Sequence, residues 1–192
     1  MKVLFNKCAD AIDCANTTKT FGCFYSAKHD ANQDIHLHEC CEILFCLSGG
    51  KSFFIDDKIY DVNSNDVFVI NPFEAHKITS EESAEFKRFV LHIHPSFLYT
   101  NSTDESNLAH CFDYRTQNTS NRLALNEDES SALTDLFEKL NQNYEFGDDI
   151  IKSAAVLEIL AAVNKYFIEK NAEHLYSEKS KNQTLIAALK YI

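Results

Sequence analysis

The 192-residue chain is long enough for one hydrophobic core with a helical appendage, and its 45% hydrophobic content is that of an ordinary globular protein. A formal net charge of −11 argues against unaided binding to DNA, because duplex binding depends on Lys and Arg side chains that neutralise phosphates. Seven cysteines without a framework spacing, and no signal-peptide pattern, predict reduced thiols and a cytoplasmic protein. No apolar run has the length of a charge-free membrane span.

Residues 1–19 have a weak pattern, in which Asp, Asn and Thr dilute the apolar residues. Terminal segments of this kind are usually mobile unless something ties them down, so a flexible or edge-packed arm is expected. The stretch from Thr20 to Ser26 alternates in the manner of a strand, and the polar residues from Lys28 to Gln33 turn the chain toward the next one.

Side chains that bind metal ions are concentrated in the following segment. Residues an even number apart on an extended strand share a face, so His36, His38 and Glu42 are expected to point the same way. Cys40 has the same parity, and a small buried apolar residue is preferred there to a further ligand. His76 lies farther along the chain and joins the other three only if the intervening hairpins fold back beside them.

The intervening residues have the composition of such hairpins. Short runs rich in β-branched and aromatic residues alternate with turn signals such as Ser48-Gly49-Gly50. The expected strands are Glu42–Leu47, Ser52–Ile55, Ile59–Val62, Val67–Ile70 and, after His76, Lys77–Ser80. A meander of short strands with turns about every eight to ten residues is typical of a closed β-barrel or a sandwich.

Two motifs make this prediction more specific. The pattern His36-x-His38-x3-Glu42-x6-Gly49 resembles the first motif of the cupin superfamily, and Asn65-Asp66-x5-Pro72-x3-His76 resembles the second, with Asn65 where most members carry Gly. In this wider setting, the Asn-Pro pair at residues 71–72 resembles the N-terminal sensor domain of AraC-type transcription regulators. The resemblance implies a cupin barrel, a double-stranded β-helix, over residues 20–100. It also allows residues 1–19 to cover the mouth of that barrel.

Residues 86–94 alternate plainly between two faces. The apolar face carries Phe89, Leu91 and Ile93, and the other face carries Arg88, Val90, His92 and His94. The polar face of a barrel strand meets either solvent or a ligand cavity. Solvent is the default expectation, and His92 is the candidate for the cavity. Residues 101–125 are expected to form a loop, polar and mobile at its start.

At Asn126 the hydrophobic period changes from two to about 3.6, which predicts a helical pair over residues 126–176. Asn126 and Glu129 have the spacing of a capping box, and Gly147 separates the two helices. The second helix has two apolar stripes: Ile150, Ala154, Leu157 and Ala161 on one face, and Ile151, Ala155, Ile159, Ala162 and Tyr166 on another. A surface helix needs one stripe, so the stripe from Ile151 to Tyr166 is the candidate for a homodimer interface. The alternative is that the barrel and the first helix cover both stripes.

Residues 177–182 are charged and polar, which is typical of a linker, and residues 184–192 begin a further amphipathic helix. This helix resembles the opening helix of the helix-turn-helix module that follows the sensor in AraC-type regulators. The two recognition helices of that module do not follow in this sequence. The resemblance therefore implies a truncated module and contact with DNA only through a C-terminal domain outside residues 1–192.

The chain is thus predicted to be mainly β with C-terminal helices: a cupin barrel followed by an antiparallel helical pair. By the resemblance, it senses a small-molecule effector and dimerises on behalf of a transcription regulator. The predicted ligand pocket comprises His36, His38, Glu42, His76 and His92. A carboxylate among imidazoles would suit a polyol, a sugar or an amine.

A metal-dependent cupin enzyme is the competing prediction. In that case His36, His38, Glu42 and His76 hold Zn, Ni, Fe or Mn, which activates oxygen or a carbonyl group. No proton-transfer group can be assigned beside such a metal from the sequence. A free-standing small-molecule binding protein is the third alternative.

Overall fold

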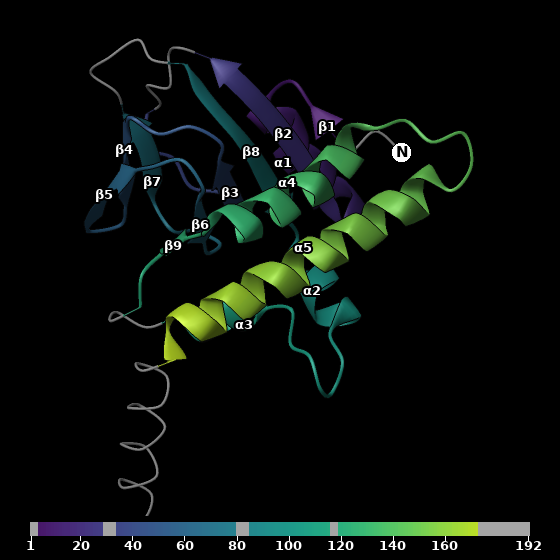
Figure 1. Ribbon diagram of the computed structural model, residues 1–192. Helices are drawn as coiled ribbons and strands as arrows, with labels where there is room; N and C mark the ends of the chain where they lie inside the picture. The colour runs from purple at the N-terminus through teal and green to yellow at the C-terminus, as the bar shows by residue number, and fades with distance from the viewer. Residues whose placement is uncertain (1–3, 29–33, 80–84, 116–118, 173–192) are drawn as a thin grey trace, which may run out of the picture.

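The computed structural model describes residues 4–28, 34–79, 85–115 and 119–172, whose strands form two sheets (Figure 1). The larger sheet contains, in spatial order, β1 (Leu4–Phe5), β2 (Phe21–Lys28), β8 (Phe86–Ile93), β3 (Cys41–Cys46), β6 (Asp66–Ile70) and β9 (Arg122–Ala124). The smaller sheet contains β5 (Lys58–Val62), β4 (Lys51–Ile55) and β7 (His76–Thr79). All pairings are antiparallel except that of β1 with β2. The fold is therefore the predicted one, a mainly β cupin barrel followed by helices.

The strands predicted from residue 42 to residue 80 are present, with boundaries that differ by one or two residues. The turn before β6 contains Asn65 at φ +69°, in the left-handed region. Asn is among the few residues besides Gly that adopt this region readily, which explains how it occupies a position where most cupins carry Gly.

Both faces of the larger sheet are buried. On β3, Cys41, Ile43 and Phe45 belong to a core that the sheet shares with the helices. Leu44 and Cys46 belong to a second core inside the barrel, which also contains Phe53 of the smaller sheet. The alternation of side chains along one strand therefore separates two cores, and Glu42 falls on the barrel side.

The helices α4 (Glu127–Asn141) and α5 (Asp148–Lys170) cover the outer face of this sheet (Figure 1). The predicted capping box begins α4: the Asn126 side chain accepts from the Glu129 backbone N–H, and the Glu129 carboxylate accepts from that of Asn126, both at 2.9 Å. Ion pairs join Glu129, near the start of α4, to Lys170 at the end of α5, and Lys139 to Glu158. The two helices therefore run in opposite directions.

Two segments contain more structure than the sequence predicted. Residues 1–19, expected to form an arm, contain β1 and the helix α1 (Cys8–Thr18), whose Ala11 and Ala15 are fully buried. Residues 101–125, expected to form a loop, contain α3 (His110–Asp113) and β9 after the end of α2 (Pro95–Asn101). The elements β1, α3 and β9 are too short to show a hydrophobic period, and the apolar pattern of the longer α1 is diluted by polar residues, so tertiary packing decides them.

The linker and terminal helix predicted for residues 177–192 lie outside the described residues. Within the ranges that are described, no helix has the length and apolar character needed to cross a membrane.

Gly22 should be essential for the close approach of α1 to the larger sheet. A Cβ atom at this position would lie 2.2 Å from the backbone oxygen of Ala11, so Gly22→Ala must displace α1. We expect a loss of about 3 kcal/mol in the free energy of unfolding, measured by urea denaturation.

Gly147→Ala is the matched control for this substitution. Gly147 has φ +74° and nothing within 4 Å of the added atom, so only the conformational cost of about 1 kcal/mol should appear. Equal losses for the two variants would contradict the contact between α1 and β2.

Candidate functional site

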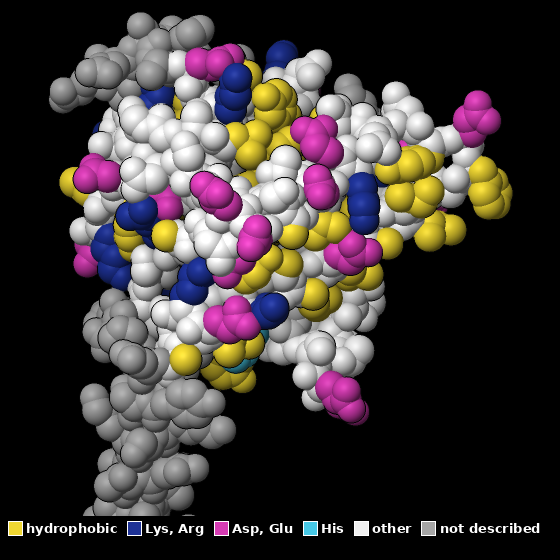
Figure 2. Space-filling view, in the orientation of Figure 1, with side chains coloured by type: hydrophobic (Ala, Val, Ile, Leu, Met, Phe, Trp, Pro, Cys, Tyr) yellow, Lys and Arg dark blue, Asp and Glu magenta, His cyan; other side chains and the backbone are white. Residues whose placement is uncertain are grey.

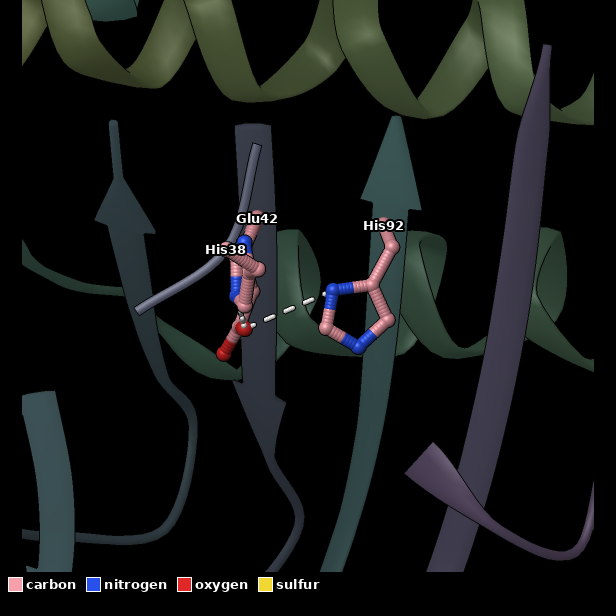
Figure 3. A group of neighbouring side chains, drawn as sticks. All are labelled: His38, Glu42 and His92. Atoms are coloured by element: carbon pink, nitrogen blue, oxygen red, sulfur yellow. Dashed lines mark hydrogen bonds and ion pairs between the residues drawn. The ribbon is translucent and has the colours of Figure 1, made fainter. Parts of the chain in front are cut away.

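The candidate site is centred on Glu42, which projects from β3 into the barrel. In the sheet register Glu42 lies directly opposite His92 of β8. His76 begins β7 on the facing sheet and forms an isolated bridge with His36, in which each backbone N–H donates to the other residue's carbonyl. His38 lies on the segment between this bridge and β3. Figure 3 shows the Glu42 carboxylate together with the imidazoles of His38 and His92.

The Glu42 Oε2 atom is the point on which the imidazoles converge. It lies 2.8 Å from His38 Nε2, 3.5 Å from His76 Nε2 and 3.5 Å from His92 Nδ1. Glu42 is 3% exposed, and His38, His76 and His92 are buried with it. The His36 ring lies 4.3 Å, centroid to centroid, from that of His76, with the two ring planes tilted by 60°. The structure therefore brings together all five residues of the predicted pocket.

Backbone carbonyl groups fix the tautomers of three of these rings. The Nδ1 atoms of His36, His38 and His76 lie 3.0, 3.0 and 2.8 Å from carbonyl oxygens two residues away, to which they donate. The Nε2 atom of each neutral ring then carries a lone pair. At His38 and His76 this lone pair faces the Glu42 carboxylate, so the contact is favourable only for a protonated ring or with a cation between the two groups.

The arrangement fits a divalent metal ion. Among the described residues, His76 Nε2 and His92 Nδ1 are buried without a hydrogen-bond partner. Ligand atoms of His38, Glu42 and His92 lie within 4.8 Å of one another. The backbone holds the other ring N–H of His38 and His76, and the other ring nitrogen of His92 contacts the Cys8 thiol. Imidazole nitrogens fixed in this way, together with a carboxylate, are a donor set that transition metals accept.

Burial and charge shift the pKa values in this cluster in different directions. Burial alone raises the pKa of Glu42, but His76, His38 and His92 hold it well below its usual range. Burial lowers the pKa of His76, but the Glu42 carboxylate raises it overall. At His92 burial prevails and lowers the pKa to about 4. Glu42 is therefore a buried anion at neutral pH, and His92 is a neutral ring.

The helix α1 closes the barrel beside the cluster. Cys8 Sγ lies 3.3 Å from His92 Nε2, and burial raises the pKa of this thiol to about 12. The cavity enclosed between Cys8, Glu42, His76 and the barrel wall is about 20 Å³, which is room for one water-sized group. In this conformation the interior accepts an ion or a water molecule, and an organic ligand needs more space.

The backbone positions of the site residues differ from those that the sequence predicted. His36, His38 and Glu42 do not share one strand, because β3 begins at Cys41 and a bend precedes it. The predicted metal ligands were His36, His38, Glu42 and His76, whereas the group with the most compact ligand atoms contains His92. Solvent was the default for the polar face of β8, yet His92 is fully buried.

Cys8 and Arg88 line the site but were not predicted from the sequence, whereas Cys40 was considered as a ligand and not preferred. Cys8 was missed because the pattern of residues 1–19 gave no reason to place it in the barrel. Arg88 shares the face of His92 in the sequence pattern but was assigned to solvent, and it lines the same cavity. Cys40 is buried, as preferred, and its thiol bonds to Asn16 Oδ1 at 3.3 Å.

A barrel of this topology, with histidines and an acid at the closed end of its interior, defines a cupin-type ligand-binding domain. The chain belongs to the family of AraC-like ligand binding domains, whose model matches residues 21–160. No curated protein matches the chain.

Several solved cupin structures have limited similarity to this chain. The Cnp3 cupin domain of Schizosaccharomyces pombe is 11% identical, with a TM-score of 0.36 over 40% of this chain and 55% of that one. A cupin protein from Bacteroides fragilis is 21% identical, with a TM-score of 0.31 over 38% and 63%. Oxalate decarboxylase from Bacillus subtilis is 19% identical, with a TM-score of 0.35 over 45% and 23%. The chain thus aligns with less than two thirds of each, and the likeness does not extend to function.

Proposed function

We propose that this chain is the effector-sensing and dimerisation module of an AraC-type transcription regulator, and that it works in the cytoplasm. The observation that carries the proposal is the convergence of imidazoles and a carboxylate inside a barrel of the AraC-like ligand-binding family. The net charge of −11 supports contact with DNA through a separate C-terminal module. Seven free cysteines support a reducing compartment.

Sensing would use α1 as the element that moves. A drug-sized organic ligand needs a cavity of roughly 300 Å³ or more, far beyond the 20 Å³ beside Glu42. The contact between Cys8 and His92 is a weak thiol–imidazole interaction, so α1 is the part of the wall that yields most readily. An effector that displaces Cys8 would change how α1 packs on β2, and the occupancy of the barrel would thereby alter its outer surface.

A divalent metal would be held by His38, Glu42 and His92, with His76 close enough to complete the set. Such an ion supplies Lewis acidity toward an oxygen atom of the bound molecule. The protein residues themselves exclude water, hold the Nε2 lone pairs toward the site and balance the charge of the ion with Glu42. In a sensor these roles give an effector a fixed anchoring point.

The same donor set favours a metal-dependent cupin enzyme as the second candidate. General acid–base catalysis needs a proton-transfer group that titrates near the working pH. Within the described part of the chain, the titratable groups beside these four residues include the His36 imidazole, whose pKa burial lowers, and the Cys8 thiol, whose pKa of about 12 makes it a poor acid or base at neutral pH. We favour sensing over catalysis because the matching family model is that of a ligand-binding domain.

Dimerisation would use the exposed apolar stripe of α5. The sequence analysis had assigned the other stripe, from Ile151 to Tyr166, to the dimer interface. Ala155, Ile159 and Tyr166, three of the five predicted interface residues, are buried within the chain, whereas Ile151 and Ala162 are half-buried. The other stripe is exposed instead: Ile150 is 69% exposed, Ile168 is 44% exposed, and Ala154, Leu157 and Ala161 lie between them. Figure 2 shows hydrophobic side chains on this surface. Their alternating spacing of four and three residues is that of a helix–helix seam.

Metal binding can be measured on protein prepared without a polyhistidine tag. Incubated with Zn²⁺ and desalted, the chain should retain near-stoichiometric metal by elemental analysis. His38→Ala and His92→Ala should lose it, because each removes a ligand. Retention should fall as the pH drops below about 6.5, where free imidazoles take up protons. His94→Ala is the control, because His94 is outside the cluster and contacts Lys19. Equal retention by all variants would remove the metal proposal.

Effector binding can be tested by thermal shift with a panel of polyols, sugars, amines and carboxylates. A compound that binds in the barrel should raise the Tm of the wild type. Glu42→Gln should weaken its binding by about tenfold or more, since one charged hydrogen-bond partner is lost. Glu39→Gln changes an exposed acid three residues earlier and should have no effect. The sensor proposal fails if nothing in the panel binds, or if Glu42→Gln binds as tightly as the wild type.

Dimerisation can be tested by sedimentation at tens of micromolar, roughly the range of ordinary dimer affinities. Ala161→Glu should give folded monomers, because it places a charge in the exposed stripe of α5. Ala132→Glu, the same change at an exposed position of α4, should leave the dimer intact. A monomeric wild type would end the proposal, and a dimeric Ala161→Glu variant would move the interface elsewhere.

A further inference from the structure

Arg88 is a buried cation that the Glu42 cluster does not explain. It points from β8 into the barrel and is 4% exposed. Among the described residues, no carboxylate lies within ion-pair distance of its guanidinium group, and the Nη1 atom has no hydrogen-bond partner. Burial of an unpaired charge is strongly unfavourable, and buried polar groups normally have partners. Its position therefore needs a reason other than stability.

A second unsatisfied group lies beside Arg88. Ser26 of β2 is its direct antiparallel partner, so both side chains are on the inner face of the sheet. Ser26 is also buried, and its Oγ atom has no hydrogen-bond partner among the described residues. Two adjacent donors that nothing in the described chain satisfies are complementary to one acceptor from outside the chain.

The surroundings of these donors are aromatic and apolar. The guanidinium carbon of Arg88 lies 4.7 Å from the Phe86 ring centroid and 6.0 Å from that of Phe24. These rings hold the guanidinium plane by cation–π contact and leave its edge for hydrogen bonds. The next row of the sheet toward the cluster places Val90 between Phe24 and Leu44. The interior thus has a cationic end, an apolar middle and the end with Glu42.

One cavity connects the two ends, because Arg88 and Glu42 both line it, together with Cys8 and Val90. We infer that the effector is a small organic monoanion whose carboxylate pairs with Arg88 and Ser26 and whose other end carries a neutral hydroxyl group. This inference rests on the proposed sensing function and specifies its ligand.

The chemistry of the two ends selects this class of ligand. A planar carboxylate matches the fork of the guanidinium group in a bidentate pair, which a neutral sugar cannot form. Without a metal ion in the cluster, a second carboxylate at that end would face the Glu42 oxygens and the Nε2 lone pairs of His38 and His76, and it would find no donor. A hydroxyl group at that end can instead donate to one of these lone pairs. The apolar row between the ends suits a short carbon skeleton.

The experiment compares 4-hydroxybutyrate, which carries its carboxylate and its hydroxyl at opposite ends, with 4-hydroxybutyramide, which has the same shape without the charge, on the chain of residues 1–192 at constant ionic strength. At roughly ten times its dissociation constant, 4-hydroxybutyrate should raise the Tm of the wild type by about 4 °C, and the amide should not. Arg88→Met should abolish the shift and, without ligand, should melt at or above the wild-type temperature, because it removes an unpaired buried charge. Arg88→Lys should bind 4-hydroxybutyrate weakly, since an ammonium group lacks the fork.

Two further variants complete the test. Lys87→Met removes an exposed cation from the same strand, paired with Glu85, and should bind 4-hydroxybutyrate normally. Ser26→Ala keeps the guanidinium and should weaken binding, which tests the site independently if Arg88→Met does not fold. The inference is overturned if Arg88→Met binds 4-hydroxybutyrate as the wild type does, or if it melts well below the wild type.

The outcome also separates this inference from the sensing function on which it rests. If the wild type binds the amide or a polyol such as erythritol but not 4-hydroxybutyrate, the anion inference is wrong and small-molecule sensing stands. If it binds none of the three, the anion inference is wrong, and the wider panel with Glu42→Gln then decides the sensing function.

Discussion

The buried carboxylate of Glu42 is the constraint on which the arrangement of the barrel depends. A carboxylate that is 3% exposed must be compensated, because an isolated charge in the interior would neutralise or destabilise the fold. Compensation comes from three separate parts of the chain: His38 before β3, His76 at the start of β7 and His92 on β8. The two sheets are therefore joined at this end by electrostatics as well as by apolar packing. Protonated rings compensate the carboxylate, whereas neutral rings turn nitrogen lone pairs toward it, so the site with neutral rings suits a cation.

Both faces of the larger sheet are buried, so the sheet lies between the binding site and the helices on the outside of the protein. Its outer face packs against α4 and α5, and its inner face holds the polar groups of the barrel. The strands β3 and β6 are consequently buried along their whole length and carry almost continuous apolar runs. The apolar outer face of the sheet requires an apolar stripe on α5, which accounts for one of the two stripes of this helix. One stripe, with Ile159, completes the outer core, and the other, with Ile150, is free to face a partner.

Much of the fold and the central residues of the site could be predicted from sequence, because they depend on local periodicity and spacing. The resemblance of the motifs to those of cupins placed Glu42 and His76 in one barrel, whereas strand parity wrongly assigned His36, His38 and Glu42 to a single strand. The position of α1 could not be predicted, since it depends on Gly22, where a missing side chain admits a helix backbone. Periodicity also identified two stripes on α5 without showing which one meets the sheet. That choice depends on the register of a helix against strands distant in sequence, which no local pattern encodes.

The polarity of the barrel interior connects the binding site to the element that closes it. The anionic end, at Glu42, lies under α1, and the cationic end, at Arg88, lies two rows farther along the same sheet. The paired positions Phe24, Val90 and Leu44 separate these ends and prevent direct neutralisation of one charge by the other. A ligand that is anionic at one end and polar at the other would therefore bind in one orientation. Its polar end would meet His92, whose ring contacts Cys8, so occupancy of the barrel and the packing of α1 are coupled through a single side chain.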